Sequence, residues 1–163
     1  MAELPGFTRV WGVAMDNRRD LPGYKYYTRP GGYRPAVHVA FLDLVEIQPA
    51  AAGAPGPANG VCLPVDNPAL VRLDARERNY RRVDVSEHLP DAPGRVWTYI
   101  GSVDGRERLA RGRRLGTAVI DAGYLGAVRA GFSALGAAEY ETARGSLCPG
   151  ELPVVELVRH DLA

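Results

Sequence analysis

The stretch between residues 66 and 85 constrains the fold most strongly, because it predicts a short helix that runs directly into a strand. Asp66-Asn67-Pro68 places a capping side chain before a proline, which is the usual chemistry of a helix start. Leu70, Leu73 and Glu77 follow at spacings of three and four residues, so they share one helical face. We therefore expect the Glu77 carboxylate on the apolar side of this helix.

The surroundings of Glu77 decide what this carboxylate does. Burial of an ionised carboxylate without partners is costly, and it raises the pKa toward neutrality unless cations or hydrogen bonds hold the charge. A glutamate in such a place can serve as a general acid or base near pH 7. The alternative is an ordinary helix-end glutamate that pairs with Arg81 or Arg82 or reaches solvent. Spacing alone leaves both interpretations open.

Length and charge exclude several classes of protein. At 163 residues the chain fits one domain, residues 1–163, which can bury a sizeable core without a metal or a disulfide. Its formal net charge of +1 creates no general attraction to nucleic acid or to an anionic membrane. Residues 101–116 hold several arginines, but acidic residues interrupt them and aromatic residues are absent. We expect a solvated loop there and no nucleic-acid partner.

The residues that usually bind metals or cofactors form no recognisable motif. Cys62 and Cys148 make no Cys-x-x-Cys unit, and His38, His88 and His160 lack metal-ligand spacing, so we expect no metal. The nucleophile motif of serine hydrolases and the glycine-rich motifs of nucleotide sites are missing. The chain start has no export-signal pattern, and no apolar run reaches the roughly 20 residues of a membrane helix. A cytoplasmic location outside membranes is the expectation.

Strand-like runs dominate the first hundred residues, and the best helix follows them. That helix is predicted over residues 119–135, with Gly136 as its stop, and is expected to pack on a sheet. The Pro/Gly/Ala-rich segment 48–58 predicts a hairpin tip, and the tyrosine-rich segment 24–33 predicts irregular structure. The fold class is therefore α+β. Strands are predicted over residues 8–14, 36–47, 61–65, 80–86, 95–100 and 154–158.

One stretch carries a resemblance to a known family. Leu73-Asp74-x-x-Glu77-x-x-Tyr80-x-Arg82-x-x-Val85, followed by Val96-Trp97-x-Tyr99, resembles the gamma-glutamylcyclotransferase-like family, and the similarity covers residues 8–105. It implies a small mixed β-barrel flanked by helices. It also implies an enzyme that turns gamma-glutamyl compounds into 5-oxoproline and a free amine, without metal or organic cofactor. Glu77 matches the acid/base glutamate of that family.

A second family signature is a Tyr-Gly-Ser-Asn or Tyr-Gly-Ser-Leu turn after the first strand, whose backbone N–H groups hold the anionic end of the substrate. The matching positions here are Trp11, Gly12, Val13, Ala14 and Met15, so the glycine is kept while the serine hydroxyl is missing. The resemblance implies that these five residues bind substrate. The alternative for Trp11 and Gly12 is a buried strand ring beside a tight turn.

Tyrosines supply the remaining candidates for substrate binding. Tyr80 and Tyr99 belong to the matched stretch, although a tyrosine beside a sheet is more often a packed ring whose hydroxyl is hydrogen-bonded. Tyr24, Lys25 and Tyr26 are expected to rim the entrance of the site.

Two functional hypotheses from different classes follow. The first is cyclotransferase-type cleavage of a gamma-glutamyl or similar amine conjugate, with Glu77 as general acid/base. The second is a non-catalytic small-molecule-binding or regulatory module on the same fold, which the missing serine favours. A variant of the first is cleavage of a larger acylated amine, recognised by the tyrosine-rich segment.

Overall fold

Strands and helices both contribute to the structure, a computed structural model that describes residues 1–47 and 56–162. The elements are β1 (Ala2–Leu4), β2 (Phe7–Asp16), β3 (Lys25–Thr28), β4 (His38–Glu46), β5 (Ala58–Gly60), α1 (Asn67–Arg76), β6 (Tyr80–Asp84), the 3-10 turn η1 (Ser86–His88), β7 (Trp97–Gly101), α2 (Val103–Arg114), β8 (Ala118–Asp121), α3 (Ala122–Leu135), α4 (Ala137–Arg144), β9 (Val154–Val155) and β10 (Val158–Asp161). The predicted α+β class is confirmed. None of the helices in the described ranges is long and apolar enough to cross a membrane.

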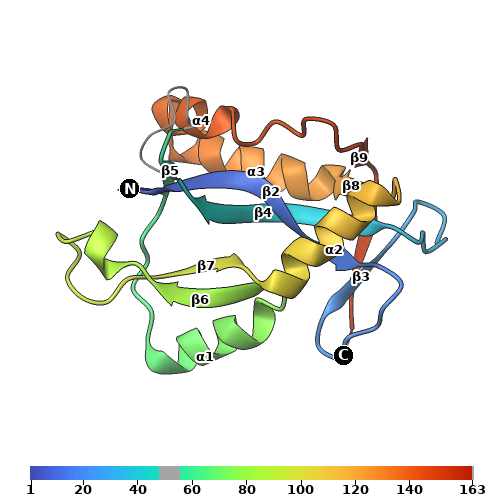
Figure 1. Cartoon of the computed structure of the whole chain (residues 1–163), viewed down its shortest axis with the longest axis horizontal. Coiled ribbons are helices and arrows are strands. Elements are labelled where there is room, and N and C mark those ends of the chain that lie inside the picture. Colours follow the sequence, from blue (N-terminus) through green and yellow to red (C-terminus); the bar gives the residue numbers. More distant parts are fainter. Residues whose placement is uncertain (48–55, 163) are drawn as a thin grey trace.

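The antiparallel pair β2–β4 forms the centre of the molecule. Its ladder runs from Phe7 opposite Glu46 to Asp16 opposite His38, with a bulge at Gly12. β8 pairs with β4 in parallel, and β9 pairs with β8 in parallel. Figure 1 shows α3 and α4 along one side of β2 and β4, and β6, β7 and α1 along the other side. The predicted strands at 8–14 and 36–47 are thus confirmed as the central pair.

Alternation along β2 and β4 sends neighbouring side chains to opposite faces. On one face, Ala14 and Ala40 pack with Leu109 of α2 and Leu125 of α3. The opposite face carries a second apolar cluster, against which several tyrosines pack. This cluster consists of Val13, Met15, Tyr27, Val39, Phe41 and Val119.

A buried side chain, rather than a backbone ladder, connects β4 to the β6–β7 pair. The Asp43 carboxylate accepts hydrogen bonds from the Gly101 N–H at 2.5 Å and from Arg106 Nε at 2.9 Å. Strand pairing in residues 1–47 and 56–162 gives four open sheets: β1–β5, β10–β3, β2–β4–β8–β9 and β6–β7. Among these residues β4 and β7 are joined by the Asp43 side chain and not by a ladder, so the closed barrel implied by the resemblance is not formed.

Most of the segment 101–116, for which a loop was predicted, forms the helix α2 over Val103–Arg114. Ser102 caps α2 by accepting a hydrogen bond from the Gly105 N–H at 3.0 Å. The buried face of α2 consists of Gly105, Leu109 and Gly112. A Cβ on Gly105 would lie 2.6 Å from the Asn79 carbonyl oxygen, and a Cβ on Gly112 would lie 2.7 Å from His38 Cβ. The helix therefore packs with two glycines against the sheet, while its arginines point away from the core or reach across β2.

Four other predictions need correction. The segment 119–135 divides into β8 and α3, because the Asp121 carboxylate caps α3 and residues 118–121 pair with two strands. Residues 61–65 are irregular, and the strand lies at β5, which pairs with β1 instead of forming the predicted hairpin with β4. The tyrosine-rich segment contains β3, which pairs with β10. Most of the predicted hairpin tip lies outside the described residues.

Candidate functional site

A cavity of about 480 Å³ brings together segments that are far apart in the sequence. It lies where β3 and β10 meet the end of α1, the start of β6 and one turn of α3. Its wall combines aromatic rings with both signs of charge, which is typical of a site for a small polar ligand. The lining residues are Gly23, Tyr24, Lys25, Phe41, Arg76, Glu77, Asn79, Tyr80, Tyr124, Arg159, Asp161 and Leu162.

Glu77 lines this cavity from the end of α1, not from the apolar face of the helix. Asp66 caps α1 by accepting the Ala69 N–H at 2.7 Å, as predicted, but none of the helical residues of α1 is buried. Glu77 itself is the C-cap, and its N–H donates to the Leu73 carbonyl at 2.9 Å. The cap and the turn into β6 place its side chain, which is 23% exposed, at the cavity wall.

The neighbouring arginine holds one oxygen of this carboxylate. Arg76 donates from Nε at 3.0 Å and from a terminal nitrogen at 2.8 Å, both to Glu77 Oε1. Arg76 is 71% exposed, so the pair is weak and open to exchange with water. Within the described ranges, the hydrogen bonds to this carboxylate fall on Oε1, which leaves Oε2 available to a ligand.

Lys25 places an ammonium group in the same cavity. Its Nζ lies 4.2 Å from the centre of the Phe41 ring and 5.5 Å from that of Tyr24. Burial, and next the positive charge of Arg159, lower the pKa of Lys25 to about 8, while Glu77 and Asp161 act in the opposite sense. A large fraction of the Lys25 side chains is therefore deprotonated at moderately alkaline pH.

Tyr24 is fixed by a buried amide. The Asn79 side-chain nitrogen donates to the Tyr24 hydroxyl at 3.1 Å, and the Asn79 side-chain oxygen accepts from Arg108 of α2 at 2.9 Å. Burial, and next the charge of Glu77, raise the pKa of Tyr24 to about 12. Tyr24 therefore stays a neutral phenol that can donate or accept a hydrogen bond at the cavity wall.

Of the other tyrosines near Glu77, Tyr80 and Tyr124 line the cavity and Tyr99 does not. Tyr80 lines the cavity, but its hydroxyl donates to the Leu42 carbonyl at 2.6 Å, and burial raises its pKa. Tyr124 of α3 lies edge-on to Phe41, with ring centres 5.1 Å apart. The Tyr99 hydroxyl donates to Asp74 at 2.7 Å, and Tyr99 is not among the lining residues. Tyr80 and Tyr124 therefore act as walls, and Tyr99 belongs to the outer surface beside α1.

Residues 11–15, the expected substrate cradle, lie inside β2 and not in a turn. The side chains of Trp11, Val13, Ala14 and Met15 are buried in the two cores, and Trp11 Nε1 donates to the Cys148 carbonyl at 3.1 Å. Gly12 is required by close packing, because a Cβ there would lie 2.5 Å from Asp43 Cβ. None of these five residues lines the cavity.

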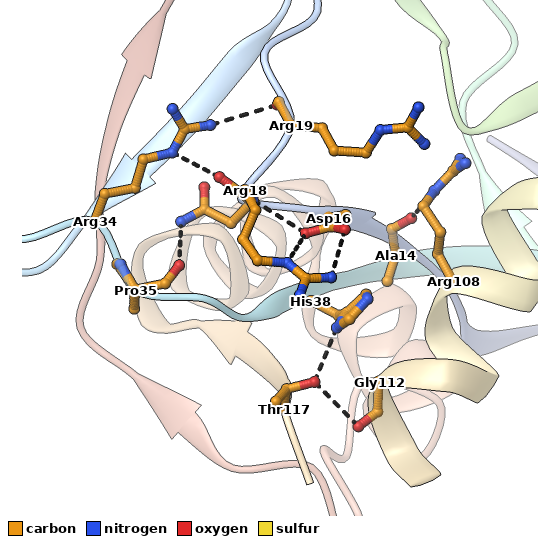
Figure 2. A network of polar contacts seen from close by, with 11 residues as sticks. Ala14, Asp16, Arg18, Arg19, Arg34, Pro35, His38, Arg108, Gly112 and Thr117 are labelled. Carbon is orange, nitrogen blue, oxygen red and sulfur yellow. Dashed lines mark hydrogen bonds and ion pairs between the residues drawn. The ribbon is translucent and has the colours of Figure 1, made fainter. Parts of the chain in front are cut away.

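A second polar cluster surrounds His38 at the end of the β2–β4 ladder (Figure 2). His38 Nδ1 lies 2.9 Å from the Thr117 hydroxyl, and burial lowers the pKa of this histidine. Arg18 donates to both oxygens of Asp16 at 2.9 and 2.8 Å and lowers the pKa of that carboxyl to about 2. His38 with Thr117 and Arg18 with Asp16 thus form two separate pairs that stabilise the strand ends.

A smaller cavity of about 150 Å³ is lined by Thr8, Arg9, Ala58 and Ser146, among others. The Arg9 guanidinium is already engaged, since it donates to Ser146 at 3.1 Å and lies 4.5 Å from the Phe132 ring centre. The larger cavity, with its carboxylates and ammonium group, is the candidate site.

Sequence patterns could indicate only part of this site. Tyr24 and Lys25, expected at an entrance, do line the cavity, whereas Tyr26 stacks on His160 with ring centres 4.8 Å apart. Tyr124 and Arg159 were not candidates. Clusters of this kind arise from chain segments that meet only in the folded protein.

Comparison of the chain with protein-family models, with curated proteins and with solved structures finds no match. A proposal for function therefore depends on the residues of the cavity.

Proposed function

We propose that this protein cleaves a gamma-glutamyl or similar amine conjugate by the cyclotransferase reaction, with Glu77 as general acid/base. The observation that carries the proposal is the Glu77 carboxylate on the wall of a cavity of about 480 Å³ that also contains Lys25 and Tyr24. A gamma-glutamyl compound offers an ammonium group and a carboxylate on one carbon atom. The cavity provides charges of both signs to meet them.

The reaction needs only proton transfers and one exchange of bonds. Glu77 removes a proton from the α-ammonium group of the substrate, and the freed amine attacks the γ-carbonyl carbon. A new carbon–nitrogen bond closes the five-membered lactam while the old amide bond breaks. Glu77 returns its proton to the departing nitrogen, and the second proton that the attacking nitrogen loses also passes to this leaving group, so the products are 5-oxoproline and the free amine in its protonated form. No water molecule, metal or organic cofactor is consumed.

Ring closure within one molecule gains most from correct positioning. A glutamyl chain held in a curled conformation closes its ring much faster than an extended one, because it loses little further conformational entropy in the transition state. Phe41, Tyr80 and Tyr124 supply rigid walls around the cavity. The hydroxyl of Tyr24 is a neutral donor beside these walls and could hydrogen-bond the oxygen that becomes negative during the attack.

The same resemblance to the cyclotransferase family suggests the fold, the domain organisation and the cellular location of the chain. The open sheets would correspond to the mixed barrel of the gamma-glutamylcyclotransferase-like family, with Asp43 bridging the seam between β4 and β7. The whole chain would act as one domain in the cytoplasm, without nucleic acid, membrane or cofactor. Substrate contacts would come from the cavity residues rather than from residues 11–15.

The test is the release of 5-oxoproline from a panel of gamma-glutamyl amines, gamma-glutamyl dipeptides and glutathione. Glu77→Gln keeps the shape of the side chain, and we expect it to lower turnover about 100- to 10,000-fold while the melting temperature stays within a few degrees. Glu107→Gln, on the exposed side of α2, is the matched control and should keep full turnover. Retained turnover in Glu77→Gln would refute the proposal.

A second candidate is a non-catalytic binding or regulatory module. The contact between Arg76 and Glu77 Oε1 favours it, because an oxygen that already accepts hydrogen bonds from a guanidinium is less available to a substrate proton. In that case the panel gives no 5-oxoproline, yet a member of it still binds in the cavity. Calorimetric titration of the panel against the wild-type protein separates the two candidates.

A further inference from the structure

The charges of the cavity do not balance. Three cations line it, Lys25, Arg76 and Arg159, against two anions, Glu77 and Asp161. Arg76 pairs with Glu77 at 2.8 Å, and Arg159 pairs with Asp161 at 2.6 Å. Pairing within the described residues thus leaves one positive charge, that of Lys25, without a carboxylate partner.

The surroundings of Lys25 hold its ammonium group in place without neutralising it. The Nζ atom lies over the Phe41 ring at 4.2 Å, and a ring face attracts a cation while leaving its N–H donors free. Among residues 1–47 and 56–162, the contacts of Nζ are with the faces of the Phe41 and Tyr24 rings. The ammonium group is partly desolvated, and an anionic ligand in the cavity could accept hydrogen bonds from it and offset that desolvation.

We infer that Lys25 binds the carboxylate of a ligand. The cavity then selects small molecules that carry a free carboxylate at one end of a short carbon chain and an amide at the other. The inference deepens the proposed function, and in its terms Lys25 binds the α-carboxylate while Glu77 faces the α-ammonium group. Substrates would then be gamma-glutamyl compounds with an unblocked α-carboxylate. Compounds with an α-ester or α-amide would be rejected.

Burial supports this assignment. The pKa of Lys25 is lowered to about 8, and a bound carboxylate would raise it again, so binding near pH 8 should be accompanied by proton uptake. Lys25 is also the only lysine in the chain, so the side-chain ammonium group can be observed without interference from others.

The experiment uses two probes that cannot cyclise because they lack an α-amino group. Glutaric acid monoamide carries a carboxylate and an amide, and glutaramide, its diamide, is the neutral analogue of the same size. Titration calorimetry at pH 7 should show that the wild-type protein binds the monoamide about 10- to 100-fold more tightly than the diamide, the usual worth of a charged hydrogen bond. Lys25→Met should remove this preference, and Lys25→Arg should restore part of it.

Arg129→Met, an exposed position on α3, removes the same charge outside the cavity and should keep the preference. The inference is overturned if the wild-type protein binds neither probe, if it binds both equally, or if Lys25→Met keeps the preference. The wild-type comparison tests the carboxylate preference even if Lys25→Met does not fold, and Lys25→Gln is then the second variant that tests whether Lys25, rather than Arg76 or Arg159, provides it. The two tests are independent because neither probe can react. If the gamma-glutamyl panel releases no 5-oxoproline, the proposed function is refuted, but the binding preference measured with the probes still holds.

Discussion

The Asp43 carboxylate lies 2.9 Å from Arg106 Nε, and this pair joins β4 to α2 at the seam beside β7. Asp43 is fully enclosed, whereas the Arg106 side chain is 43% exposed. Removal of the guanidinium would leave a buried carboxylate with the Gly101 N–H as its remaining partner. The pair therefore matters more to stability than an ion pair on the surface.

Arg106→Met should lower the free energy of unfolding by about 1.5–3 kcal/mol, the typical cost of a lost hydrogen bond to a charged group. Urea denaturation measures the change. Arg144→Met is the control, because Arg144 pairs with Glu141 where both side chains are more than half exposed. We expect that change to stay within about 1 kcal/mol. Equal effects in the two variants would contradict the role given to the seam.

Gly12→Ala should destabilise the protein by about 1–3 kcal/mol through overpacking. The added Cβ would lie 2.5 Å from Asp43 Cβ, which belongs to a buried side chain held by two hydrogen bonds and cannot move aside easily. Gly126→Ala on α3 is the control, since nothing lies within 4 Å of its added Cβ, and helix propensity predicts a gain of about 0.5–1 kcal/mol. Thermal or urea unfolding shows whether Gly12→Ala lowers the free energy of unfolding while Gly126→Ala raises it.

Asn17→Ala should cost about 3 kcal/mol or more, because three buried backbone groups lose their partner. The Asn17 side chain donates to the carbonyls of Tyr27 and Pro35, both at 2.9 Å, and accepts the Tyr27 N–H at 2.8 Å. These bonds attach β3, and with it Lys25, to the end of β2. The exposed Asn67→Ala is the comparison and should change the unfolding free energy by less than about 0.5 kcal/mol.

Lys25→Met should stabilise the protein below pH 8. The pKa of Lys25 is about 8 in the folded protein against an ordinary 10.5, so between these values the unfolded chain binds more protons than the folded one. The free energy of unfolding of the wild-type protein should therefore increase between pH 8 and pH 10.5 through Lys25, and that of Lys25→Met should lack this increase. Denaturant titrations of both proteins at pH 7 and pH 10 measure it, and parallel pH dependences would show that Lys25 is not desolvated.

Local patterns predicted the elements whose cause is local. The cap at Asp66, the stop at Gly136 and the long run 36–47 all depend on neighbouring residues, and the structure has them. The α2 helix was missed because its buried face offers one large apolar side chain, Leu109, between glycines. The cap at Ser102 and the spacing of Gly105, Leu109 and Gly112 were the available signals.

The site itself depends on contacts that no local pattern contains. Gly12 illustrates the difficulty, because a glycine needed for a turn and a glycine needed for close packing look the same in a sequence. Glu77 reaches the cavity for another reason than the one predicted, namely the turn from α1 into β6. Lys25 meets Phe41 and Arg159 only after β3 has paired with β10 and packed beside β4.

The glycine-lined face of α2 also bears on how such a chain can change over time. A substitution at Gly105 or Gly112 would drive a side chain into Asn79 or His38, so mutational scanning should find these two positions nearly intolerant. Arg111, Arg113 and Arg114 on the outer side of the same helix are exposed and should accept many replacements, unlike Arg106 and Arg108, which bond to Asp43 and Asn79. Evolution can thus redesign the outer C-terminal half of α2 while the inner contacts of the helix remain fixed.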